Sequence, residues 1–109
     1  MNNVLHTKNI ATFDKFDIVF SALVDDSPEI ALDRETLDEI AVGNLVVFTA
    51  QIEVKICGVT LATEYLGCCI YNSYDEFIEI KDSYFQYMKN EALAAAKIEL
   101  DSIMKQLQA

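Results

Sequence analysis

Carboxylates dominate the side chains of this sequence that could do chemistry. The chain has eighteen Asp and Glu against eight Lys and Arg, a formal net charge of −10 over 109 residues. A pair of carboxylates can work as general acid and base, but such pairs usually sit in surroundings that separate their pKa values. Residues 25–39 instead hold seven acids with Arg34 as the single cation, which is typical of a solvated surface. The seven are Asp25, Asp26, Glu29, Asp33, Glu35, Asp38 and Glu39.

A second acidic cluster follows the middle of the chain, at Asp75, Glu76, Glu79 and Asp82. Charge of this density acts at long range, so it repels DNA, RNA and anionic membranes and favours partners with a basic surface. The lysines are scattered, whereas a nucleic-acid-binding face needs clustered cations to displace counterions. We therefore predict no direct binding to nucleic acid or membrane. The alternative role for the acids is to keep the protein in solution.

The remaining reactive side chains form no recognisable catalytic or metal-binding motif. A cysteine nucleophile needs a nearby base, and His6 is the single histidine, far from Cys57 and from the adjacent Cys68 and Cys69. A structural zinc site takes four ligands, and residues 25–39 lack the central Gly of a calcium loop. Isolated glycines cannot build a phosphate loop. We expect no enzyme activity, cofactor or metal, and mostly buried free thiols.

Aromatic side chains gather around the second acidic cluster. Tyrosine is enriched at protein interfaces, and beside acids it suits a surface that meets Arg and Lys. We predict that Phe85 lies inside the fold, and that Tyr74 and Tyr87 lie at its edge and contact a partner. The full set is Tyr65, Tyr71, Tyr74, Tyr84, Phe85 and Tyr87.

The N-terminal quarter is expected to hold one element. Residues 1–11 are polar and expected to be flexible. Phe13, Phe16 and Phe20 are spaced as on one face of a helix over about residues 12–24. The β-branched Ile18 and Val19 weaken that interpretation, so a strand over about residues 17–24 is the open alternative.

The next elements have clearer boundaries. After the break at 25–28, Asp33 is expected to cap a short helix that ends at Gly43. Residues 45–56 are rich in β-branched side chains, and their second half alternates between apolar and polar. A tight turn at Cys57-Gly58 leads into a returning strand over 59–66, and Gly67 permits a bend or bulge before residues 68–71.

The C-terminal third is expected to be helical. Ser73 and Glu76 fit a capping box that opens a short helix. The last helix, about residues 84–107, carries a continuous apolar stripe, which needs a sheet or a partner helix to cover it. A homodimer through this helix is one way to cover it.

Together these elements predict one α+β domain over residues 1–109. An antiparallel hairpin or three-stranded sheet would be covered on one face by helices, including the long C-terminal one. The sequence shows no secretory signal and no apolar run of membrane-spanning length, so we expect a cytoplasmic protein, in the host cytoplasm if a phage encodes it.

In its overall texture the chain resembles small orphan proteins of phages and other mobile elements, including anti-CRISPR and anti-restriction proteins. The resemblance is carried by the acidic stretch 25–39, by the hairpin followed by residues 67–71, and by the acidic turn before one long C-terminal helix. It implies a stoichiometric inhibitor that blocks a host nucleoprotein, often at a nucleic-acid site. No functional positions carry over residue by residue.

The resulting hypothesis is a non-catalytic acidic protein that imitates DNA and blocks a basic surface of a host defence complex. Its expected partner-binding residues are Asp25, Asp26, Glu29, Glu35, Asp38, Glu39, Tyr74, Asp75, Glu76, Glu79 and Tyr87. Two alternatives stay open. One is an immunity protein that neutralises a basic nuclease toxin, and the other is a small-ligand or structural and assembly domain.

Overall fold

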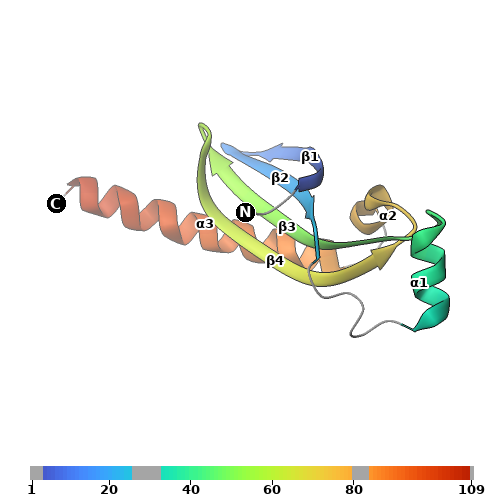
Figure 1. The fold of residues 1–109 in the computed structure, drawn as a ribbon. Helices are drawn as coiled ribbons and strands as arrows, with labels where there is room; N and C mark the ends of the chain where they lie inside the picture. The colour runs from blue at the N-terminus through green and yellow to red at the C-terminus, as the bar shows by residue number, and fades with distance from the viewer. Residues whose placement is uncertain (1–3, 26–32, 80–83, 109) are drawn as a thin grey trace.

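The chain forms a curved antiparallel sheet with a long helix across one face, shown in a computed structural model that describes residues 4–25, 33–79 and 84–108 (Figure 1). The strands are β1 (Val4–Phe13), β2 (Phe16–Leu23), β3 (Val46–Ile56) and β4 (Val59–Tyr71). The helices are α1 (Arg34–Ala41), α2 (Tyr74–Glu79) and α3 (Tyr84–Gln108). The α+β class, the antiparallel sheet and the long C-terminal helix are confirmed.

The strands are ordered β1-β2-β3-β4, each pairing with the next in sequence. The sheet is larger than the expected hairpin or three strands, because two predictions for the N-terminal quarter are wrong. Residues 4–13 form an edge strand instead of a loose segment, and residues 16–23 form a strand instead of a helix. The alternative of a strand over 17–24 is therefore the correct one.

Strand β2 shows why the helical spacing misled. Phe16, Ile18, Phe20 and Ala22 are all buried, so the period that matters is two residues. Phe13 belongs to the preceding strand, and it pairs with Phe16 across a two-residue turn. Asp14 in that turn has φ of +58°, a conformation that Asp tolerates better than most residues.

Strands β3 and β4 follow the sequence prediction closely. Phe48, Ala50, Ile52 and Val54 are buried on one face of β3, and the residues between them are more exposed. The strands meet at Cys57-Gly58, where both residues have positive φ, as in the tight turns that match sheet twist. Pairing shifts between Leu66 and Cys69, so a bulge lies at the Gly67 region as expected.

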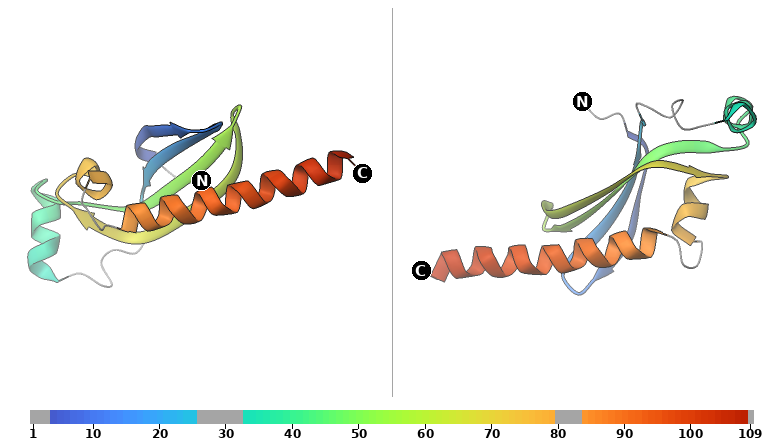
Figure 2. Two further views of the ribbon diagram at one scale, coloured as in Figure 1. Left: turned by 180° about the vertical axis from the view of Figure 1, so that it is seen from behind. Right: turned by 90° about the horizontal axis from the view of Figure 1, so that it is seen from below.

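The core lies between the sheet and α3, which packs on β3 and β4. Its helix side is made by Phe85, Met88, Ala92 and Ala96, four residues on one face. The two alanines allow the helix axis to approach the sheet closely. Beyond Ala96 no described residue of α3 is buried, and the helix continues past the edge of the sheet (Figure 2). The molecule is consequently elongated, at 58 × 27 × 20 Å.

Candidate functional site

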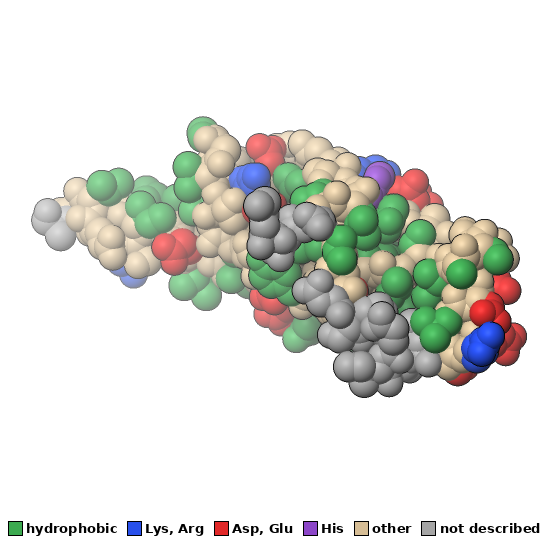
Figure 3. Space-filling model, in the orientation of Figure 1, with side chains coloured by type: hydrophobic (Ala, Val, Ile, Leu, Met, Phe, Trp, Pro, Cys, Tyr) green, Lys and Arg blue, Asp and Glu red, His purple; other side chains and the backbone are tan. Residues whose placement is uncertain are grey.

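The two acidic helices lie at the same end of the molecule. Helices α1 and α2 are separated by two long strands in sequence, yet both stand where β3 begins and β4 ends (Figures 1 and 2). We call this region the acidic end and define it by Glu35, Asp38, Glu39, Asp75, Glu76 and Glu79. In the space-filling view, acidic side chains cluster over α1 (Figure 3).

Helix α1 is held by its caps. The Asp33 carboxylate accepts a hydrogen bond from the Thr36 backbone N–H at 2.8 Å, as expected for an N-cap. Hydrogen bonds from Thr36, chiefly from its side chain, hold the pKa of Asp33 below its usual range. At the other end, Gly43 has φ of +86°. None of the eight residues of α1, all of them described, is buried. The helix therefore stands outside the core, with its charges facing water.

The acids of α1 differ in their exposure and in the contacts that they make within the protein. Glu35 and Asp38 are exposed. The carboxylate of Glu39 accepts a hydrogen bond from the Asn44 amide at 2.8 Å, which ties the helix to its C-terminal turn. Arg34 lies 3.7 Å from Asp38, but both side chains are so exposed that the pair adds little stability. Glu35 and Asp38 are the clearest candidates for contact with a partner.

Asp25 is placed differently from the rest of its cluster. It is half-buried, and one of its oxygens accepts a hydrogen bond from the Thr49 hydroxyl at 3.3 Å. It also approaches the β4 bulge, because a Cβ added at Gly67 would lie 3.8 Å from the same oxygen. Asp25 thus connects the segment that follows β2 to strand β3. Asp26 and Glu29, also expected to bind a partner, lie outside the described residues.

Helix α2 begins with the predicted cap. The Ser73 hydroxyl accepts the Glu76 backbone N–H at 3.1 Å. The Glu76 carboxylate accepts from the Asn72 amide at 2.8 Å, which orients it at the start of the helix. Asp75 and Glu79 are exposed. Asp82, the fourth acid of this cluster, lies outside the described residues.

Strand β1 brings two residues to α2, Lys8 and His6, that the sequence analysis did not assign to the acidic clusters. Lys8 lies 3.3 Å from the Asp75 carboxylate. The His6 ring stacks on Tyr74, with ring centroids 5.0 Å apart and planes within 9°. His6 Nε2 is buried with no hydrogen-bond partner among the described residues. The sequence did carry a signal for this placement, because His6, Lys8 and Ile10 alternate along the chain and alternate residues of a strand share one side.

The aromatic predictions have mixed outcomes. Phe85 is buried, as expected. Tyr87 is 64% exposed and is available to a partner. Tyr74 is half-buried, because its ring packs on His6 and lies edge-on to Phe48 at 5.2 Å. Burial raises the pKa of Tyr71, with smaller contributions from nearby groups. Of the two proposed tyrosine contacts, Tyr87 presents the larger free surface.

Two cysteine side chains are described, those of Cys57 and Cys69. Cys57 is an exposed free thiol in the β3–β4 turn, an exception to the expectation of mostly buried thiols. Cys69 is buried, and its thiol donates a hydrogen bond to the Leu66 carbonyl oxygen at 3.3 Å. Across the described parts of the chain, no three His, Cys, Asp or Glu side chains gather as metal ligands would.

No described helix combines the length and hydropathy needed to cross a membrane. Comparison of the chain with protein-family models, with curated proteins and with solved structures gave no match.

Proposed function

We propose that this protein acts by binding, as an acidic inhibitor that covers a basic nucleic-acid-binding surface of a host defence complex. The observation that supports this most is the acidic end, where two helices from distant parts of the sequence place exposed carboxylates at the same end of the molecule, with the ends of β3 and β4 between the helices (Figures 1 and 2). An array of exposed carboxylates resembles the phosphates of a nucleic acid in charge and steers association with a basic partner.

The arrangement of α1 fits this role. Its eight residues contribute no buried side chain, so its charges are not needed for the core. Tyr87 and Tyr84, both 64% exposed on the first turn of α3, offer aromatic surface for arginine and lysine side chains. The proposal assigns steering to the carboxylates and short-range binding energy to the tyrosines.

The first test is capture of partners from a nuclease-treated host lysate at low and high salt. We expect a basic nucleic-acid-binding protein to be retained at low salt, released at high salt, and displaced by its own nucleic acid. Displacement by the cognate nucleic acid but not by an equal charge of heparin is the decisive result, because any polyanion would compete with general charge attraction. A captured nuclease that is the cognate toxin would favour the immunity-protein alternative, and retention without competition would contradict the proposal.

The second test uses charge reversal once a partner is in hand. Glu35→Lys with Asp38→Lys should weaken binding by about tenfold or more and reduce its salt dependence. The matched control is Glu91→Lys with Glu99→Lys, which makes the same change in net charge at exposed positions of α3. Equal weakening by the two double variants would show that net charge matters and that the acidic end does not.

A further inference from the structure

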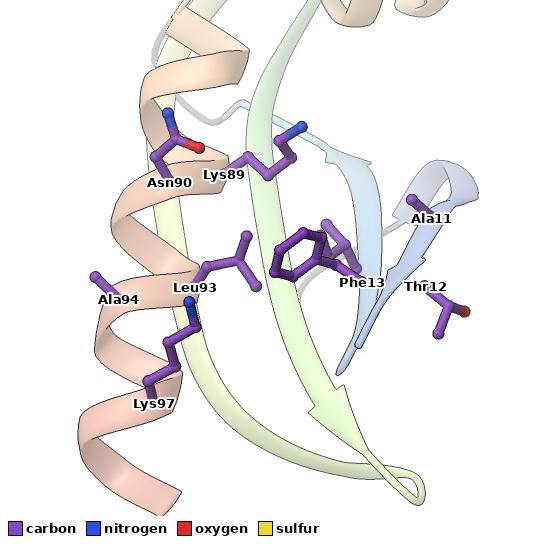
Figure 4. A pocket seen from close by; sticks show the side chains of 9 residues that line it. Ala11, Thr12, Phe13, Lys89, Asn90, Leu93, Ala94 and Lys97 are labelled. Carbon is purple, nitrogen blue, oxygen red and sulfur yellow. The ribbon is translucent and has the colours of Figure 1, made fainter. Parts of the chain in front are cut away.

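A groove separates the β1–β2 hairpin from α3 on the sheet face that the helix covers (Figure 4). Its volume is about 440 Å³, within the range of small-molecule sites. Phe13 at the end of β1 and Leu93 on α3 point toward one another across it, and Ile18 and Ala94 add apolar lining. Phe13 is 54% exposed, so a large aromatic face is left to water here.

Two lysines flank this apolar groove. Lys89, Leu93 and Lys97 are spaced four residues apart on α3, which places them along one side of the helix. The two lysines are separated by about 12 Å along the helix axis. The Lys97 ammonium lies 5.6 Å from the centre of the Phe13 ring, and the Lys89 ammonium lies 6.0 Å from that of Phe85. Both cations thus lie close to an aromatic ring, exposed at Phe13 and buried at Phe85.

Neither lysine is neutralised by an acid in the described structure. The chain has more than twice as many acids as cations, yet no described carboxylate lies within ion-pairing distance of Lys89 or Lys97. The described residues that line the groove include no acid. Asp14 and Asp101 line a separate hollow that also borders Lys97, whereas Lys89 does not line that hollow. The groove is therefore a local cationic and apolar site on an anionic body.

We propose that this groove binds a small amphipathic anion, with an apolar chain or ring between Phe13 and Leu93 and an acidic head near the lysines. Burial of apolar ligand surface supplies the free energy, and the ammonium groups select the sign of the head.

The test measures binding of dodecanoate below its micelle concentration by calorimetry, beside dodecanol and dodecyltrimethylammonium. We expect dodecanoate to bind about tenfold more tightly than either, although the protein's net charge should favour the cation. Lys89→Gln with Lys97→Gln should remove that preference. The matched control is Lys55→Gln with Lys105→Gln, which removes the same number of charges at positions outside the groove lining.

Methyl and aromatic NMR signals locate the site. Dodecanoate should shift the signals of Phe13 and Leu93 in the wild-type protein and leave those of the acidic end unchanged. Equal affinity for the ammonium compound, or shifts that lie elsewhere, would overturn the proposal. Signals of Phe13 and Leu93 that depend on protein concentration and do not respond to dodecanoate would also overturn it, by showing that copies of the chain meet there.

Discussion

Phe77 is the residue that joins the short helix α2 to the rest of the core. It is fully buried. Its ring centroid lies 5.1–6.0 Å from those of four aromatic neighbours, mostly with rings close to edge-on, a favourable geometry for aromatic pairs. Because these neighbours come from β2, β3, β4 and α3, one side chain couples the sheet to both C-terminal helices. They are Phe20, Phe48, Tyr71 and Phe85.

Replacement of Phe77 by alanine should therefore be strongly destabilising. Loss of a buried phenylalanine typically lowers the free energy of unfolding by about 3–5 kcal/mol, from lost burial and from the cavity left behind. Urea unfolding monitored by circular dichroism measures this. Tyr87→Ala is the comparison, since that side chain is 64% exposed and should change stability by less than about 0.5 kcal/mol. Similar losses in both variants would contradict the assigned core.

At the level of elements, the sequence predicted those whose boundaries depend on local chemistry. Four such features are present in the structure: the α1 cap at Asp33, the end of α1 at Gly43, the Cys57-Gly58 turn and the Ser73 cap of α2. Each of these signals depends on a few adjacent residues and needs no tertiary contact. They are the part of the fold that a sequence can specify directly.

The elements that were wrong depend on their neighbours. The stripe of Phe13, Phe16 and Phe20 fits helical spacing, but Phe16 and Phe20 also fit the two-residue period of a strand, and pairing with β3 decides between them. Strand β1 is largely exposed and half of its residues are polar, with register shifts around Leu5 and Ile10. Such bulges and polar residues protect an edge strand from pairing further. Its composition therefore resembled that of a loose segment.

The candidate site was predictable only in its parts. Both acidic clusters and the α2 cap were evident in the sequence, but the placement of the clusters at the same end of the molecule depends on the lengths of β3 and β4. The groove was missed for a similar reason. Lys89 and Lys97 appeared as scattered lysines, and only the return of β1 toward α3 places Phe13 beside them.

Among the turns, Gly58 gives a sharp test at the element scale. Its φ of +81° is unfavourable for any residue with a Cβ, although nothing lies within 4 Å of the position of that atom. Gly58→Ala should lower the free energy of unfolding by about 1–2 kcal/mol through the backbone alone. Gly67→Ala is the control, because that glycine lacks positive φ and its new Cβ would make an ordinary contact. Equal cost at both positions, measured by urea unfolding, would contradict this account of the hairpin.

Over the whole molecule, packing and charge are distributed unevenly. Five buried phenylalanines hold the centre together. At one end stands α1, with no buried residue, and at the other α3 extends past the sheet with Leu107 81% exposed (Figure 2). The homodimer expected through α3 stays a prediction, and the exposed apolar side chains of this extension are where it would form. Both ends are thus available for contacts that the core does not require.

The net charge of −10 should make the stability of the whole domain depend on salt. Like charges on a compact body repel one another, and raising NaCl from about 0.01 M to about 0.1 M shortens the Debye length from about 30 Å to about 10 Å. We therefore expect the Tm to rise over this range in a calorimetric scan at neutral pH. The variant Glu91→Lys with Glu99→Lys, whose two reversals each add two charge units, has a formal net charge of −6 and should show a smaller rise. Because both substitutions are at exposed positions, they leave the core unchanged, and an equal rise in both proteins would mean that salt acts by a route other than screening of net charge.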